Sequence, residues 1–151
     1  MTQEINIATF ILDDDIDVLD IIKATIDRAG IRNYKLFTNE EKFISGLTED
    51  IHVCVVDHWL SRRTGLDILK EIKNKNEASF VIAYTVGTNP DIIIDYLNGG
   101  ADRFVDKNKA NHLDMLTSYL KEGLEIGTRR IEYSSFLKAK KEKMSHEQST
   151  V

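Results

Sequence analysis

Short apolar runs alternate along this chain with longer segments in which apolar residues recur at three- and four-residue spacing. In residues 16–29, for example, Leu19, Ile22 and Ile26 show this helical spacing. Strands are predicted at residues 7–12, 34–38, 51–57, 79–85 and 102–107. The third of these runs, IHVCVVD, is almost entirely apolar, which is typical of a strand covered on both faces. Strands that alternate with helices predict a parallel sheet with helices on both sides.

Capping signals place the beginnings of several helices. Thr38 followed by Glu41 predicts a capping box that opens a helix over residues 39–47. Asn89 and Pro90 predict an N-cap and a first helical residue. The last helix is expected to begin near Ala110, and its apolar face carries leucines at 113, 116, 120 and 124.

The composition changes after this helix has begun. Residues 129–143 hold six Lys or Arg against two Glu, while Ile131, Phe136 and Leu137 keep an apolar character. We therefore expect a folded domain over residues 5–125, and a helical extension over residues 126–151 that ends in a frayed basic tail from Met144. The extension is either a solvated helix end or a helix that binds a partner or a second copy.

Bulk properties narrow the functional classes. The net charge of −5 argues against direct binding of nucleic acid. The single cysteine, Cys54, excludes an internal disulfide framework and is typical of a reducing compartment. No apolar run is long enough to span a bilayer, and the N-terminal residues do not resemble a secretion signal. We expect a cytoplasmic protein without membrane contact.

Chemistry-bearing residues stand at the ends of four predicted strands. Asp13 and Asp14 follow the first strand, and Asp57 ends the third. Thr85 ends the fourth strand and Lys107 the fifth. Ligands of open α/β sheets bind at the carboxyl ends of the strands. If the first and third strands are neighbours, their ends lie about 4.8 Å apart, which brings three carboxylates together.

Carboxylates grouped in this way favour a small hard cation such as Mg²⁺. A cation, the Lys107 ammonium and the Thr85 hydroxyl would together surround a phosphoryl group on Asp57, and aspartate is a known covalent acceptor. Each residue alone has an ordinary explanation, and Asp15 and Asp17 fit helix caps or partners of the helix dipole. The interpretation as a phosphoryl site rests on the placement of all five residues at the ends of four strands.

At this point the sequence resembles the receiver domain of bacterial two-component response regulators, the CheY-like family. The resemblance covers residues 7–124. It rests on ILDDDIDVL, on VVDHWLSRRTGLDIL with Gly65 eight residues after Asp57, on FVIAYT and on GGADRFVDK. It implies a flavodoxin-like (βα)5 fold, a doubly wound parallel five-stranded sheet in the order 2-1-3-4-5, here with an extended C-terminal helix.

The resemblance implies a role for each residue of the cluster. Asp57 would be the phosphoacceptor. The metal, Mg²⁺ or Mn²⁺, would be held by Asp57, by Asp14 directly, by Asp13 mainly through water and by the backbone carbonyl of Trp59.

Three further roles come from the same resemblance. Thr85 and Lys107 would bind the phosphoryl group. Thr85 would also move toward it, and Phe104 would turn into the vacated space, so that these two residues form the switch. His58 is expected to lie exposed in the loop and to take no part in the chemistry.

A receiver domain takes its phosphoryl group from a sensor histidine kinase or a histidine phosphotransfer protein. It then switches a face that binds a downstream protein, here the face formed by residues 91–98, residues 102–107 and the final helix. The resemblance implies a phosphoacceptor that dephosphorylates itself and does not turn over external substrates. No output domain is expected in this chain, which is either a stand-alone receiver or a fragment. A homodimer through the switching face or through the C-terminal helix is an open alternative.

Several positions depart from the family pattern. Ser61 and Asn108 stand where the family has prolines. A cis bond before a residue other than proline costs about 3 kcal/mol, so the loop after Lys107 is expected to be trans or strained. Val86 replaces a small residue, and with Trp59 it is expected to shield the site and slow hydrolysis of the phosphoryl group.

Two other functional classes compete with the receiver. A pseudo-receiver would keep the fold as an interaction module that works without phosphorylation. A haloacid-dehalogenase-like phosphatase would use Asp13 and Asp15, but it normally has threonine or valine where this chain has Asp17.

Overall fold

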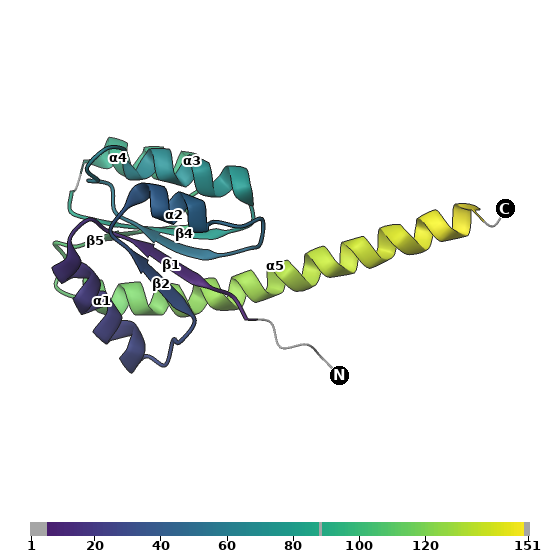
Figure 1. The fold of residues 1–151 in the computed structure, drawn as a ribbon, viewed down its shortest axis with the longest axis horizontal. Helices are drawn as coiled ribbons and strands as arrows, with labels where there is room; N and C mark the ends of the chain where they lie inside the picture. Colours follow the sequence, from purple (N-terminus) through teal and green to yellow (C-terminus); the bar gives the residue numbers. More distant parts are fainter. Residues whose placement is uncertain (1–5, 88, 150–151) are drawn as a thin grey trace.

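A single sheet of five parallel strands, in the order β2-β1-β3-β4-β5, organises this computed structural model, which describes residues 6–87 and 89–149 (Figure 1). The strands are β1 Thr9–Leu12, β2 Tyr34–Phe37, β3 Val53–Val56, β4 Phe80–Thr85 and β5 Arg103–Asp106. The helices are α1 Ile16–Arg28, α2 Glu40–Gly46, α3 Gly65–Lys75, α4 Pro90–Asn98 and α5 His112–Ser149. The predicted fold class and strand order are confirmed.

Two apolar layers lie on opposite faces of the sheet. Because successive side chains of a strand alternate in direction, Ile11 of β1 belongs to the layer under α1 and α5, whereas Leu12 belongs to the layer under α2, α3 and α4 (Figure 1). All residues of β3 and β4 are buried, as expected for strands covered on both faces. The central strands are thereby fixed, and their carboxyl ends form a rigid edge.

The helix beginnings follow side-chain caps. Asn89 accepts a hydrogen bond at the start of α4, and Pro90 is the first residue of that helix, as predicted. The predicted capping box of Thr38 and Glu41 is wrong, because the N-cap of α2 is Asn39. Asparagine caps helices at least as well as threonine, and here it lies directly before the first helical residue.

The helix α5 continues past the domain, as expected. It begins at His112, two residues after the predicted start, and residues 144–149, expected to be frayed, are helical. Arg130 anchors α5 to the domain, because it donates to the carbonyl of Ala78 at 2.8 Å and to the carboxylate of Asp102 at 3.1 Å. Beyond Ile131, which still packs against the core, the helix projects away from the domain (Figure 1). Among the described residues, no helix combines the length and apolar character that crossing a bilayer requires.

Candidate functional site

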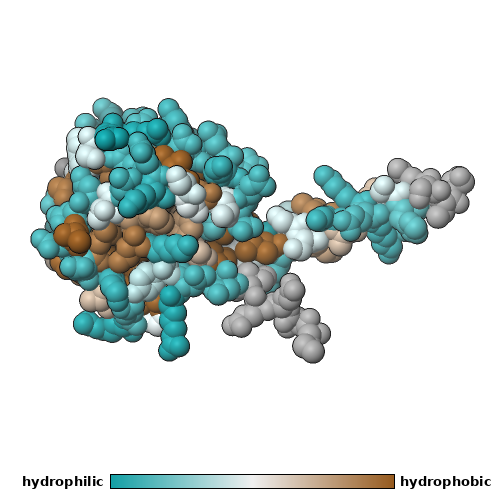
Figure 2. Space-filling model, viewed as in Figure 1, coloured by the Kyte–Doolittle hydropathy of each residue, from teal (hydrophilic) through white to brown (hydrophobic). Residues whose placement is uncertain are grey.

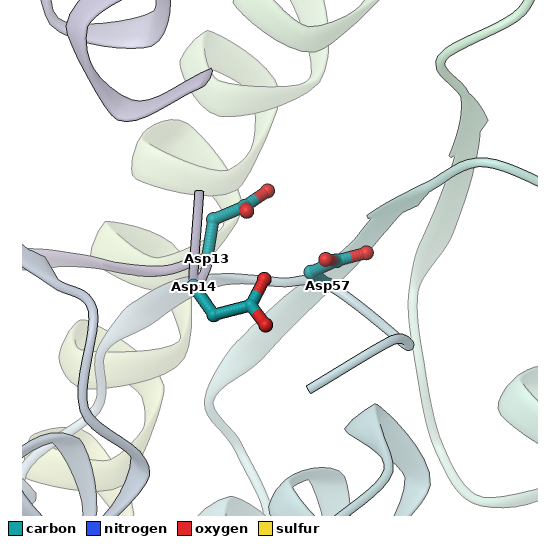
Figure 3. A group of neighbouring side chains, drawn as sticks. All are labelled: Asp13, Asp14 and Asp57. Carbon is teal, nitrogen blue, oxygen red and sulfur yellow. The ribbon is translucent and has the colours of Figure 1, made fainter. Parts of the chain in front are cut away.

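Three carboxylates meet at the carboxyl edge of the sheet. Leu12 of β1 pairs with Val56 of β3, so the residues that follow these strands lie side by side. Oxygen atoms of Asp13, Asp14 and Asp57 all lie within 4.8 Å of one another, and Figure 3 shows the side chains grouped at the ends of the two strands. The predicted cluster is therefore present. Asp13 and Asp57 are buried, whereas Asp14 is exposed.

Lys107 reaches this cluster from the end of β5. Its Nζ donates to Asp13 at 2.6 Å and lies 3.7 Å from Asp57. The backbone N–H of Lys107 donates to the carbonyl of Thr85 at 2.9 Å, which aligns the ends of β4 and β5. The ammonium also lies over the Tyr84 ring, 5.0 Å from its centroid. One ammonium faces three carboxylates, so the site retains uncompensated negative charge.

The protonation equilibria reflect this excess of negative charge. The pKa of Asp57 is raised, first by burial and also by Asp13, although Lys107, the Thr85 hydroxyl and the Trp59 backbone N–H oppose the shift. The pKa of Asp14 is raised by partial burial and by Asp13. A hard cation would relieve this repulsion, and oxygen atoms at these separations match the donors that such cations prefer. The three carboxylates therefore fit a divalent metal.

Helix α1 begins directly beside the cluster. The side chain of Asp15 caps it by accepting from the backbone N–H of Asp17 at 2.9 Å, as predicted. Asp17 lies in the first turn, where the helix dipole favours a negative charge. Asp13 accepts from the backbone N–H of Asp15 at 2.9 Å, which holds one of its oxygens and leaves the other to Lys107.

The two predicted switch residues lie on adjacent strands. Thr85 is buried at the end of β4, and Phe104 is half-buried on β5. Phe104 contacts Tyr96 of α4 edge to face, with ring centroids 5.8 Å apart. A hollow of about 360 Å³ beside Phe104 is lined by Ile93 and Met115, among others. Phe104 therefore borders both the buried ring of Tyr96 and an open hollow.

His58 is buried, which contradicts the expected exposed position. Its Nδ1 lies 2.8 Å from the hydroxyl of Tyr96, which is also buried. Burial lowers the pKa of His58 and raises that of Tyr96, so both side chains are neutral near pH 7. The pair links the segment that follows Asp57 to the inner face of α4. Sequence reasoning missed this pair, although Tyr96 lies one helical turn after Ile92 on the face directed at the core.

The side chain of Trp59 connects the loops that follow β3 and β4. It is 57% exposed, and its indole N–H donates to the carbonyl of Val86 at 2.7 Å. This hydrogen bond joins the residue two positions after Asp57 to the residue that follows Thr85. The backbone of Gly65 packs against the backbone of Asp57, since a Cβ on Gly65 would come within 2.5 Å of the Asp57 carbonyl oxygen. A glycine is therefore required at the beginning of α3.

Hydrogen bonds hold the two loops that lack the family prolines. The buried carboxylate of Glu40 accepts from the Ser61 hydroxyl at 3.2 Å and from the Arg62 backbone N–H at 3.0 Å. Asp106 accepts from the backbone N–H of Asn108 at 2.8 Å. No cis peptide bond occurs among the described residues, so the trans alternative for the loop after Lys107 is confirmed. Glu40 was missed because no motif marks a buried acid that holds a distant loop.

Comparisons with known proteins agree with this architecture. The family model of the response regulator receiver domain matches residues 9–119. The response regulator SaeR of Staphylococcus aureus (strain USA300) is 33% identical over 99 residues, which cover 64% of this chain and 42% of SaeR. A cyclic di-GMP phosphodiesterase of Thermotoga maritima is 28% identical over 106 residues, which cover 70% of this chain and 28% of that protein. This chain thus spans less than half the length of these two relatives.

A solved structure shows the same fold. The BeF3-activated receiver domain of DrrB, an OmpR/PhoB homolog of Thermotoga maritima, superposes with a TM-score of 0.70 at 24% identity, over 80% of this chain and 99% of that one.

Replacing Asp57 with asparagine is predicted to stabilise the metal-free protein at neutral pH. Because burial and Asp13 raise the folded-state pKa above the ordinary 3.8, ionisation of Asp57 weakens the folded state. This loss of folding free energy is absent at a pH well below 3.8, where Asp57 is protonated in both states. It grows as the pH rises through the raised pKa. In EDTA, the Tm of D57N should exceed that of the wild type by a few degrees at pH 7, and the difference should shrink toward low pH. D20N, which changes an exposed acid of α1, serves as control, and equal Tm values for D57N and the wild type at pH 7 would contradict the prediction.

The hydrogen bond between His58 and Tyr96 is predicted to stabilise the domain. Tyr96→Phe leaves the buried Nδ1 of His58 without its partner, which costs about 1–3 kcal/mol of unfolding free energy. The matched control is Tyr133→Phe, because Tyr133 is 63% exposed on α5. Urea unfolding should show a lower midpoint for the first variant only. A midpoint unchanged in Tyr96→Phe would show that the pair contributes nothing.

Proposed function

This chain belongs to the response regulator receiver domain family, and from that premise we propose that it accepts a phosphoryl group on Asp57 from a phosphohistidine. The observation that carries the proposal is the position of Asp57 between two other carboxylates and the Lys107 ammonium. Receiver domains work with sensor histidine kinases or histidine phosphotransfer proteins, and one of these would be the donor.

The reaction moves one phosphoryl group between two side chains. An oxygen of the Asp57 carboxylate attacks phosphorus, the P–O bond forms as the P–N bond of the phosphohistidine breaks, and the donor imidazole leaves with the electron pair. Lys107 needs to shift only slightly to pair with a phosphoryl oxygen, since its Nζ already lies 3.7 Å from Asp57. The Thr85 hydroxyl donates to another oxygen. Positioning and charge neutralisation of this kind are what phosphoryl transfer requires.

The metal of this site would be Mg²⁺, or Mn²⁺ in its place. Asp14, Asp57 and the Trp59 carbonyl would bind it directly, and Asp13, which is held by Lys107, would bind mainly through water. When bound, the ion supplies positive charge to the phosphoryl oxygens. The pKa values of Asp14 and Asp57 are raised first by burial and also by Asp13, and a bound cation would favour the charged form of both carboxylates.

The new charge on Asp57 would be transmitted to the face of α4, β5 and α5. Thr85 moves toward the phosphoryl group, and Phe104 turns inward into the space that it leaves. Phe104 packs on Tyr96, so the movement also reaches α4. On this helix Ile94 and Leu97 are each 51% exposed, and they provide an apolar surface for a downstream protein. The equilibrium between two arrangements of this face is the signal.

The activity is confined to one covalent site. The chain accepts a phosphoryl group and hydrolyses it from its own Asp57, and it does not turn over external substrates. The receiver unit corresponds to residues 5–125, and residues 126–151 form its extension. We place the protein in the cytoplasm, where kinases of this class present phosphohistidine.

Hydrolysis of the phosphoryl group should be slow. The hydrogen bond from Trp59 to the Val86 carbonyl joins the loops that follow Asp57 and Thr85, and the Val86 side chain itself is 46% exposed. Both residues restrict the approach of water in line with the P–O bond. A long-lived acyl phosphate suits stable signalling or a phosphorelay.

Incubation with acetyl phosphate and Mg²⁺ tests the proposed function. Intact mass spectrometry should show one added phosphoryl group on the wild type and none on Asp57→Ala. Asp20→Ala, which removes an exposed acid of α1, should be modified like the wild type, and EDTA should prevent modification. An unmodified wild type would instead indicate a pseudo-receiver, and release of phosphate from an external substrate would indicate a phosphatase.

The shielding residues are expected to set the lifetime of the phosphoryl group. Val86→Ala and Trp59→Ala should each speed its loss several-fold, because water gains access to the acyl phosphate. Trp59→Phe keeps a large ring but loses the N–H donor, so it separates steric shielding from the hydrogen bond. Decay of the phosphorylated mass after removal of acetyl phosphate measures the rate. Rates equal to that of the wild type in both alanine variants would refute the shielding role.

A further inference from the structure

Among the described residues, no side chain of α5 beyond Ile131 belongs to the apolar core of the domain. Every side chain from Glu132 to Glu147 is exposed, including Tyr133 at 63%, Phe136 at 62% and Met144 at 53%. Figure 2 shows hydrophobic residues between hydrophilic ones along this segment. In proteins most of the stability of a helix comes from the packing of one of its faces and not from helix propensity. Large apolar side chains on such a helix indicate a surface that becomes covered.

A stripe along α5 follows a heptad spacing of alternating three and four residues. We call it the α5 seam. Its apolar positions are Met115, Tyr119, Ile126, Tyr133 and Phe136. Its charged positions are Glu122, Arg129, Lys140 and Lys143. The seam runs beside the line of fully buried core residues Leu116 and Leu120, and its residues Met115, Tyr119 and Ile126 pack at the edge of the core while remaining partly exposed. Sustained spacing of this kind is typical of helices that pair side by side.

Charge is distributed unevenly along the same helix. Residues 112–128 contain three acids and one lysine, a net charge of −2 with histidine neutral. Residues 129–147 contain six Lys or Arg and three Glu, a net charge of +3. The two halves of α5 are therefore complementary to each other. A straight helix cannot bring its own two halves together, whereas a second copy in the opposite orientation supplies the complementary charge to each half.

We propose that α5 pairs with α5 of a second copy of this chain in antiparallel orientation, through the α5 seam. The seam consists of the a and d positions of the heptad. In antiparallel pairing, the a positions of one helix face the d positions of the other. Ile126 then packs against Phe136 of the second copy, and Arg129 lies over the ring of Tyr133 of the second copy. The two-fold axis passes near Ile131, and every contact occurs twice.

The charged positions of the seam decide the orientation. In this register Glu122 faces Lys140 of the second copy, and Lys143 faces the ring of Tyr119. Glu122 already pairs with Arg103 of its own domain, but a carboxylate accepts more than one donor. In parallel pairing, Glu122, Lys140 and Lys143 would instead each face the same residue of the second copy. Like charges in such contacts oppose association, so the parallel arrangement is disfavoured.

The domains do not obstruct this arrangement. Seam residues Met115, Tyr119 and Ile126 border the core contacts of α5 and remain partly exposed, so the second helix packs beside the domain. The pairing covers the projecting segment of each copy with the domain-bound half of the other. It requires neither a metal nor phosphorylation, and it does not rest on the proposed function.

Sedimentation of the unmodified protein in EDTA tests the pairing. The wild type should show a monomer–dimer equilibrium, and Phe136→Glu should be monomeric at concentrations where the wild type is dimeric. Ser135→Glu is the matched control, because it adds the same charge to the neighbouring exposed position outside the seam. Circular dichroism of each variant verifies that the domain is folded. Asp57→Ala should dimerise like the wild type, which separates this test from that of the phosphoacceptor.

Cross-linking tests the orientation. Cys54 is fully buried, so an introduced cysteine is the reactive thiol. A short bis-maleimide should join Glu125→Cys protein to Ala139→Cys protein when the two are mixed, with one of them enlarged by a tag. Neither variant alone should cross-link efficiently, because like positions along the antiparallel pair lie about 18 Å apart for residue 125 and about 24 Å apart for residue 139, at 1.5 Å per residue.

Other outcomes would overturn the proposal. These are a monomeric wild type at all concentrations, a dimer that survives Phe136→Glu, or cross-links between identical positions. Salt provides a further discrimination, since screening weakens Glu–Lys pairs but relieves like-charge repulsion. The dimer should therefore weaken at about 1 M salt, and strengthening would contradict antiparallel pairing. A wild type that stays monomeric and binds anionic lipid vesicles through α5 would assign the seam to a membrane surface.

Discussion

The contact of Lys107 with Asp13 at 2.6 Å is the interaction on which the site depends. It brings the end of the edge strand β5 to the ends of the central strands, across the buried end of β4. One ammonium does not balance three carboxylates, and the pKa of Asp57 is raised, first by burial and also by the charge of Asp13. The fold tolerates this imbalance because β1 and β3 are held by apolar layers on both faces. The resulting group of carboxylates is suited to bind a cation, which is the arrangement that the proposed phosphoacceptor function requires.

Much of this arrangement could be predicted from the sequence, because it follows from strand periodicity. Apolar runs fixed the strands, and parallel strands necessarily bring residues such as Asp57 and Lys107 to one edge. What could not be predicted depends on side-chain direction. Whether His58 points outward or into the core is decided by Tyr96, which lies 38 residues away. The failure at α2 was similar in kind, because Thr38 and Asn39 are both good caps and the path of the chain selects between them.

The departures from the family pattern are compensated by specific polar contacts. A proline restricts a loop by limiting its backbone angles. Here the buried Glu40 restrains Ser61 and Arg62 instead, and Trp59 ties its loop to Val86. Such restraints are reversible in a way that a proline ring is not. A hydrogen bond between two loops can break and re-form as the site changes its charge. The loops around Asp57 are therefore restrained but can still change conformation.

The same site is also physically close to α5. Lys107 lies over Tyr84, and the hydroxyl of Tyr84 is 2.5 Å from Nδ1 of His112, which begins α5. The first turn of the long helix is therefore two contacts away from the acidic cluster. At its other anchor, Arg130 binds Asp102 beside the start of β5. The helix is thus held by one contact at the end of β4 and by another beside the start of β5, and these are the two strands whose carboxyl ends carry Thr85 and Lys107.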